Sequence, residues 1–112
     1  MSYWDCGTFR LRHGVLELIA GLALLEVEGV RGVGMRSGYG GERPKRKNLS
    51  KGIKAQVEEG RITFTLQIYA DYDSEFLPVA RVVQERIKEV AERMTGMMVT
   101  AVDVEVVGVN AP

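Results

Sequence analysis

Apolar and polar residues alternate without a break from Ile62 to Asp71. Successive side chains of a β-strand point to opposite faces, so this alternation predicts a strand with one buried face and one polar face. The apolar set is Ile62, Phe64, Leu66, Ile68 and Ala70. A sheet that contains such a strand needs a second layer of structure to cover its apolar face.

Two strands are predicted upstream of this segment. Residues 53–58 alternate in the same way, and the Glu59-Gly60 link to the long strand favours a tight hairpin, since glycine supplies the positive φ that such turns need. Residues 30–35 are a weaker candidate because they contain two glycines.

Two further strands are predicted near the ends of the sequence. In residues 8–12, TFRLR, Phe9 and Leu11 alternate with arginines, and residues 98–109 alternate valines with acids. The predicted apolar face of the last strand holds Thr100, Val102, Val104 and Val106, and its polar face holds Asp103 and Glu105.

Two amphipathic helices are predicted from apolar residues that recur at helical spacing. The first runs from Val15 to a stop near Gly29. The second begins at Pro78, which suits a first helical turn, and ends at Gly96. The buried stripe of the second helix is predicted to be Val79, Val83, Ile87, Val90 and Met94.

The element order is therefore β-α-β-β-β-α-β. The predicted fold class is α/β (α+β), a two-layer sandwich with two helices on one face of one mixed sheet of about four to five strands. At 112 residues the chain is expected to be a single domain, 1–112, with its core at about 7–109.

The charges are unevenly distributed although the formal net charge is zero. Residues 42–54 contain six basic residues and one acid, and all of these except Lys54 lie in a connection predicted to be long and mobile at about 37–51. A segment of this kind favours a contact with a partner protein, with nucleic-acid backbone and small anions as alternatives. The predicted partner-binding residues are Arg43, Lys45, Arg46, Lys47 and Lys51.

Catalytic and metal-binding patterns are weak. With only Cys6 and His13, the sequence has too few nitrogen and sulfur ligands for a tetrahedral zinc site and no pattern of an activated nucleophile. The glycines at 38–41 match a GxxG loop only in their spacing, and they lack the lysine of a phosphate-binding loop. We therefore predict no catalytic residue, metal or cofactor.

An acidic run after the long strand is similar to the start of a calcium-binding loop. Asp71, Asp73 and Glu75 have the right spacing, but the sixth and twelfth positions hold Phe76 and Val82 in place of glycine and glutamate. The run is better explained as a strand end followed by the N-terminus of a helix, where acids interact favourably with the dipole.

The expected location is the cytoplasm. The apolar run VLELIAGLALL is shorter than the roughly 20 residues that a bilayer requires, and Glu17 interrupts it. The N-terminus has no basic segment followed by a long apolar one, so no signal peptide is predicted.

Several stretches in order resemble the alkaline shock protein family of mainly Gram-positive bacteria, also described as Gls-type envelope stress response proteins. They are GTFRL, VLELIAGLALLEVEGVRGVGM, KNLSKGIKAQVEEGRITFTLQIYADY and VARVVQERIKEVAERMTGMMVTAVDVEVVGV, which together span about 7–109. The resemblance implies a small, non-enzymatic protein of the general stress response that self-associates as a homo-oligomer. In that family the namesake is held at the inner face of the cell membrane by a membrane-anchor protein.

The expected function is thus a cytoplasmic scaffold or adaptor that acts through protein-protein interactions near the membrane. Its expected partners are further copies of itself and a membrane-anchor protein, with membrane association indirect. Two less favoured alternatives remain: a nucleic-acid-binding module that uses residues 43–54, and after it a regulator linked to lipid metabolism.

Overall fold

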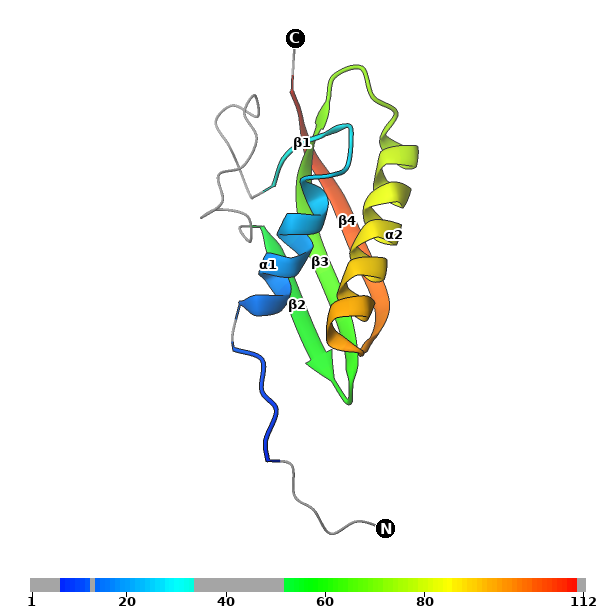
Figure 1. Ribbon diagram of the computed structural model, residues 1–112. Coiled ribbons are helices and arrows are strands. Elements are labelled where there is room, and N and C mark those ends of the chain that lie inside the picture. Colours follow the sequence, from blue (N-terminus) through cyan, green and yellow to red (C-terminus); the bar gives the residue numbers. More distant parts are fainter. Residues whose placement is uncertain (1–6, 13, 34–51, 111–112) are drawn as a thin grey trace.

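The computed structural model describes residues 7–12, 14–33 and 52–110. These residues form two helices and four strands in the order α1-β1-β2-β3-α2-β4 (Figure 1). The elements are α1 (Val15–Leu24), β1 (Val30–Val33), β2 (Ile53–Glu58), β3 (Arg61–Asp71), α2 (Phe76–Thr95) and β4 (Met98–Asn110).

The strand β3 lies at the centre of a mixed sheet. β4 runs parallel to it along its whole length, from Arg61 to Asp71. β1 pairs antiparallel with the end of β3, at residues 68–70, and β2 pairs antiparallel with residues 61–66. Because a strand has only two edges, β1 and β2 must lie end to end on the edge that β4 does not occupy. The sheet is therefore three strands wide at any point along β3.

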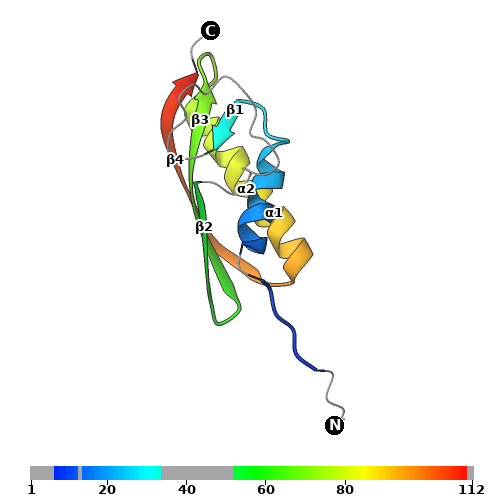
Figure 2. The same ribbon diagram turned by 90° about the vertical axis from the view of Figure 1, so that its left-hand side faces the viewer.

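Both helices cover one face of this sheet (Figure 2), as the alternation in β3 requires. Its alternate side chains Ile62, Phe64, Leu66 and Ile68 are completely buried. α2 contributes a buried stripe at intervals of four residues to the same core, and α1 adds both large and small apolar side chains. The stripe of α2 is Val83, Ile87 and Ala91, and the contribution of α1 is Leu16, Ile19, Ala20, Ala23 and Leu24. The predicted stripe is corrected at its end, because Met94 is 64% exposed and Ala91 is buried in its place.

The predicted strand at residues 8–12 does not form, which corrects two predictions. The observed order is α-β-β-β-α-β, and the sheet is three strands wide in place of the expected four to five. The segment is extended but pairs with no described strand, and Phe9 is 75% exposed. Alternation of side chains favours a strand, but a strand also needs a neighbouring edge for its hydrogen bonds. Here the segment leads away from the sheet before α1 begins (Figure 1).

The last strand differs from its prediction near its beginning. The pairing with β3 shifts between Val99 and Ala101, so Thr100 is an extra residue in β4. Its hydroxyl lies 3.3 Å from that of Thr63 on the open face of the sheet, whereas it was predicted to share a face with Val102. Because of this bulge, the residues of β4 before Thr100 face the opposite side of the sheet from the one that strict alternation predicts.

The helix boundaries also differ slightly. α1 ends at Leu24, and turns lead from it to Gly29, the predicted stop. α2 begins at Phe76, two residues before the predicted start. The predicted strand at 30–35 is observed for 30–33, and its remainder and the predicted loop at 37–51 lie outside the described residues.

Gly29 fixes the junction between α1 and the sheet. Its φ is +95°, and a Cβ placed on it would lie 2.7 Å from Cγ2 of Val79 in α2. Its carbonyl accepts a 2.8 Å hydrogen bond from the backbone N–H of Asp71 at the end of β3. Glycine is needed here both for the left-handed backbone and for the close approach of α2.

Replacing Gly29 by alanine should lower the free energy of unfolding by about 2–4 kcal/mol, because left-handed strain and overpacking act together. Gly96→Ala is the matched control: φ is +74° but no atom lies within 4 Å of the added Cβ, so only about 1–2 kcal/mol of strain is expected. Chemical denaturation of both variants measures the difference. Equal losses in the two variants would show that the contact with Val79 has no effect.

Candidate interaction surfaces

The described residues contain no group of three or more histidine, cysteine, aspartate or glutamate side chains that could hold a metal ion. Cys6 and His13 lie outside the described residues. The surface of this part of the chain includes an acidic hollow beside the start of α2, exposed apolar side chains on both helices and the edges of the sheet.

The predicted partner-binding residues, Arg43, Lys45, Arg46, Lys47 and Lys51, all lie outside the described residues. The structure does place the two ends of the segment that contains them. Val33 pairs with Ile68 at the end of β1, and the carbonyl of Gly52 accepts a 3.1 Å hydrogen bond from the N–H of Gln67. The segment thus leaves and rejoins the sheet at neighbouring positions on the edge of β3.

An open hollow of about 510 Å³ lies where the connection from α1 to β1 meets the start of α2. Its lining includes the acids Glu28, Asp71 and Asp73. The hydroxyl of Ser74 donates a 2.8 Å hydrogen bond to the carbonyl of Asp71 and so closes the turn after β3. The acidic run in the sequence includes Asp71 and Asp73. It could not indicate that Glu28 lines the same hollow, because that residue comes from a distant part of the chain.

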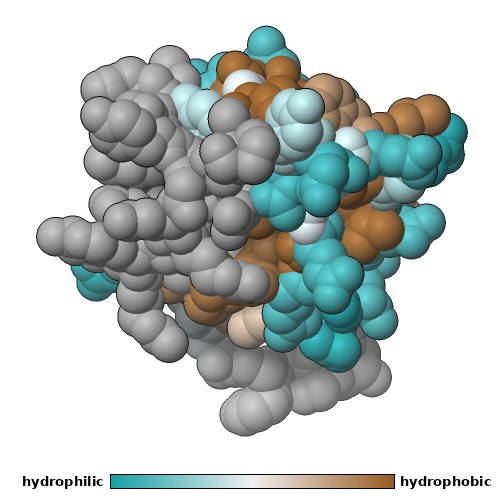
Figure 3. All heavy atoms as spheres, turned by 90° about the horizontal axis from the view of Figure 1, so that it is seen from above, coloured by the Kyte–Doolittle hydropathy of each residue, from teal (hydrophilic) through white to brown (hydrophobic). Residues whose placement is uncertain are grey.

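Both helices expose large apolar side chains on their outer faces. Leu18 and Leu22, one turn apart on α1, are 41% and 38% exposed. The first turns of α2 expose Phe76, Leu77 and Val82. At the end of the molecule where α2 begins, apolar surface interrupts the hydrophilic surface (Figure 3). Apolar side chains grouped on a surface are typical of contacts with other proteins.

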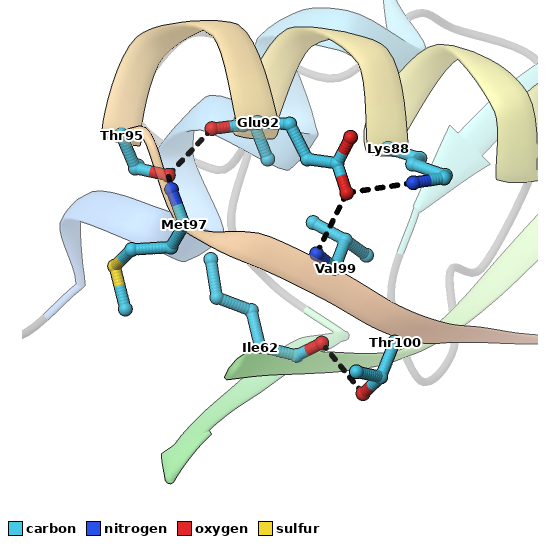
Figure 4. A network of polar contacts seen from close by, with 8 residues as sticks. Ile62, Lys88, Glu92, Thr95, Met97, Val99 and Thr100 are labelled. Atoms are coloured by element: carbon cyan, nitrogen blue, oxygen red, sulfur yellow. Dashed lines mark hydrogen bonds and ion pairs between the residues drawn. The ribbon is translucent and has the colours of Figure 1, made fainter. Parts of the chain in front are cut away.

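The outer edge of β4 is closed at its beginning by side chains of α2. The carboxylate of Glu92 accepts hydrogen bonds from the N–H of Val99, at 2.9 Å, and from the ammonium of Lys88, at 2.6 Å (Figure 4). Nearer the start of α2, the side-chain amide of Gln84 donates a 3.1 Å hydrogen bond to the carbonyl of Val102. These contacts satisfy backbone groups that an edge strand would otherwise present to solvent or to another chain.

The two partners of Glu92 also set its acidity. The hydrogen bond from Lys88, and after it the one from the backbone of Val99, lowers the pKa of the Glu92 carboxyl below its usual value of 4.5. Both stabilise the ionised form, since each donates a hydrogen to the carboxylate. Nearby, Thr95 donates a 2.7 Å hydrogen bond to the carbonyl of Ala91 and accepts a 3.0 Å bond from the N–H of Met97, which closes the turn from α2 into β4 (Figure 4).

Comparison with known proteins identifies the family. Residues 4–111 match the model of the alkaline shock protein 23 family, whose function is described as cell envelope-related. The chain belongs to this family. The resemblance seen in the sequence alone is therefore confirmed.

Two relatives come from Gram-positive bacteria. The chain is 29% identical over 107 residues to the uncharacterized protein YqhY of Bacillus subtilis strain 168, an alignment that covers 93% of this chain and 78% of that protein. It is 30% identical over 98 residues to the uncharacterized protein Spy1535 of Streptococcus pyogenes serotype M6, covering 87% of this chain and 74% of the relative. No solved structure matches the chain. Neither described helix is both long enough and apolar enough to cross a membrane.

Glu92→Gln should lower the thermal midpoint at neutral pH, because the amide keeps the shape of the side chain but loses its charge-assisted hydrogen bonds. The folded-state pKa is depressed, so the carboxylate contributes fully above 4.5 and its contribution is lost as the pH falls through the lower folded-state value. The gap in midpoint between the native protein and the variant should therefore be constant above 4.5 and shrink below it.

Glu85→Gln on the same helix is the matched control, because Glu85 is exposed and no described residue donates a hydrogen bond to its carboxylate. Thermal unfolding followed by circular dichroism over a series of pH values measures both variants. A gap for Glu92→Gln that stays the same in acid, or an equal effect of Glu85→Gln, would contradict the role given to Glu92.

Proposed function

We propose that the protein is a non-enzymatic scaffold that self-associates and binds partner proteins at the cytoplasmic side of the cell membrane. The observation that carries this proposal is the family match across residues 4–111, because the family is described by a cell envelope-related function and by no reaction. A membrane-anchor protein is the partner proposed to hold it there.

The surfaces support a role in protein contacts. The exposed apolar side chains of α1 and α2 lie on the outer faces of the helices, where no described element covers them. They are available to partners without any rearrangement of the core.

The distribution of charge supports the same role. Residues 42–54 carry six basic residues and one acid, while residues 55–112 carry ten acids and five bases. Opposite charges on two regions of one chain attract neighbouring copies, and charges of this kind also speed the first encounter with a partner. We propose Arg43, Lys45, Arg46, Lys47 and Lys51 as the residues that make this contact.

Light scattering at low salt should give a mass above the 12.4 kDa of one chain, and this mass should rise with protein concentration. It should fall at about 1 M salt, where the screening length drops to about 3 Å and charge pairing is weakened. A mass of one chain at every concentration in low salt would contradict self-association.

Affinity capture from the native host under envelope stress tests partner binding. The full chain should retain a membrane-anchored protein, and changing Lys45, Arg46, Lys47 and Lys51 together to alanine should reduce the amount retained by at least about tenfold. The matched control replaces four exposed charges of α2: Arg81, Glu85, Glu89 and Arg93. Equal retention by both variants would show that the basic segment does not make the contact.

A further inference from the structure

Residues 8–12, called here the N-terminal arm, have the pattern of a strand but pair with no described strand. All five residues are exposed, including Phe9 at 75% and Leu11 at 36%. The arm is extended and leads away from the body of the molecule (Figures 1 and 2). Its side chains alternate between apolar residues and the arginines Arg10 and Arg12.

On its outer edge, away from β3, β4 pairs with no other described strand. Only its beginning is closed by α2, where the carbonyl of Val102 bonds to Gln84 and therefore points away from β3. Backbone groups alternate in direction along a strand, so those of Val104 and Val106 point outward as well. No hydrogen bond to these outward groups is recorded among the described residues.

The side chains of this edge complement those of the arm. Val102, Val104 and Val106 pack against the core on the helix side of the sheet, and Asp103 and Glu105 are exposed on its open face. A strand laid beside this edge shares its two-residue period. If Phe9 and Leu11 of the arm lie on the same face of the sheet as the three valines, the arginines of the arm lie on the open face beside Asp103 and Glu105.

We propose that the arm of one copy adds as a strand to the outer edge of β4, at residues 103–106, in a second copy. This inference rests on the self-association proposed above and names its interface. Backbone hydrogen bonds hold the added strand, Phe9 and Leu11 extend the apolar face, and the Arg10 and Arg12 guanidinium groups pair with the Asp103 and Glu105 carboxylates.

The acceptor has to be a second copy because the arm cannot reach its own edge. The arm leaves the start of α1 at the end of the molecule where the β2–β3 hairpin lies, and the free part of β4 approaches the opposite end (Figure 1). The start of β4 lies at the hairpin end, where the N–H of Met98 donates a 3.2 Å hydrogen bond to the carbonyl of Gly60.

The outer edge of β2 is a poorer acceptor. The N–H of Ala55, which points outward there, already donates to the carboxylate of Glu17 in α1 at 3.3 Å. The exposed polar residues of β2 include Lys54, which would repel an arginine of the arm. The charge pattern therefore selects β4 over β2.

Reciprocal charge reversal in the full chain tests the interface. One variant is Arg10→Glu with Arg12→Glu, and the other is Asp103→Lys with Glu105→Lys. Each variant alone places like charges across the contact and should raise the dissociation constant for self-association by about ten- to hundredfold. An equimolar mixture should regain association as mixed complexes, because the arm of each variant then meets an edge of opposite charge.

Analytical ultracentrifugation measures association, and circular dichroism shows that each variant is folded. Glu105→Lys also removes an exposed hydrogen bond from Gln67, so recovery in the mixture is the decisive result, since a loss of folding could not be reversed by mixing. Arg81→Glu with Glu85→Arg, on the exposed face of α2, is the control and should leave association unchanged, because the exchange keeps the net charge and touches neither the arm nor the edge of β4.

The outcomes separate this interface from the scaffold role. If the native chain associates and the charge-reversed variants associate equally well, or the mixture fails to recover, the interface is wrong and self-association stands. If the native chain stays a single chain at every concentration, both proposals are wrong.

Discussion

Four alternate side chains of β3, Ile62, Phe64, Leu66 and Ile68, are completely buried beneath the two helices, and the rest of the fold depends on that burial. Removing a side chain of this size from water contributes about 1.5–3 kcal/mol, so the four together are comparable with the 5–15 kcal/mol that stabilises a typical domain. Because a shift of one residue would turn all four toward solvent, the burial also sets the register of every strand that pairs with β3. The positions of β1, β2 and β4 then follow from which part of this central strand each one meets.

The sequence predicted the elements whose pattern is local. β2, its hairpin, β3 and α2 carry strong periodicity, and the structure shows all of them near their predicted positions. The pattern of residues 8–12 is just as regular, yet no strand forms, because alternation describes a side-chain arrangement and does not supply an edge to pair with. The bulge at Thr100 was missed for a related reason: it depends on how β4 meets β3, and nothing within β4 marks it.

The candidate interaction surfaces also differ in how far the sequence could predict them. The basic segment was visible as composition, and its residues lie outside the described part of the chain, so its role stays a prediction. The closure of the β4 edge by Gln84 and Glu92 could not be predicted, because both residues look like ordinary polar positions of an amphipathic helix. Only the packing of α2 along β4 brings them to the strand. The structure thus shows an edge protected by side chains at its beginning, while no described strand pairs with the remainder. Partial protection of an edge is a common balance between solubility and assembly.

The end-to-end arrangement of β1 and β2 has a consequence for how this domain tolerates change. Val33 and Ile53 pair with Ile68 and Leu66, so the chain departs from β3 and resumes only two residues further along it. Lengthening the intervening segment adds only slowly growing loop-closure entropy and leaves the pairings of the described strands as they are. The domain therefore has a position for grafting a binding sequence at the point where its charge is most concentrated.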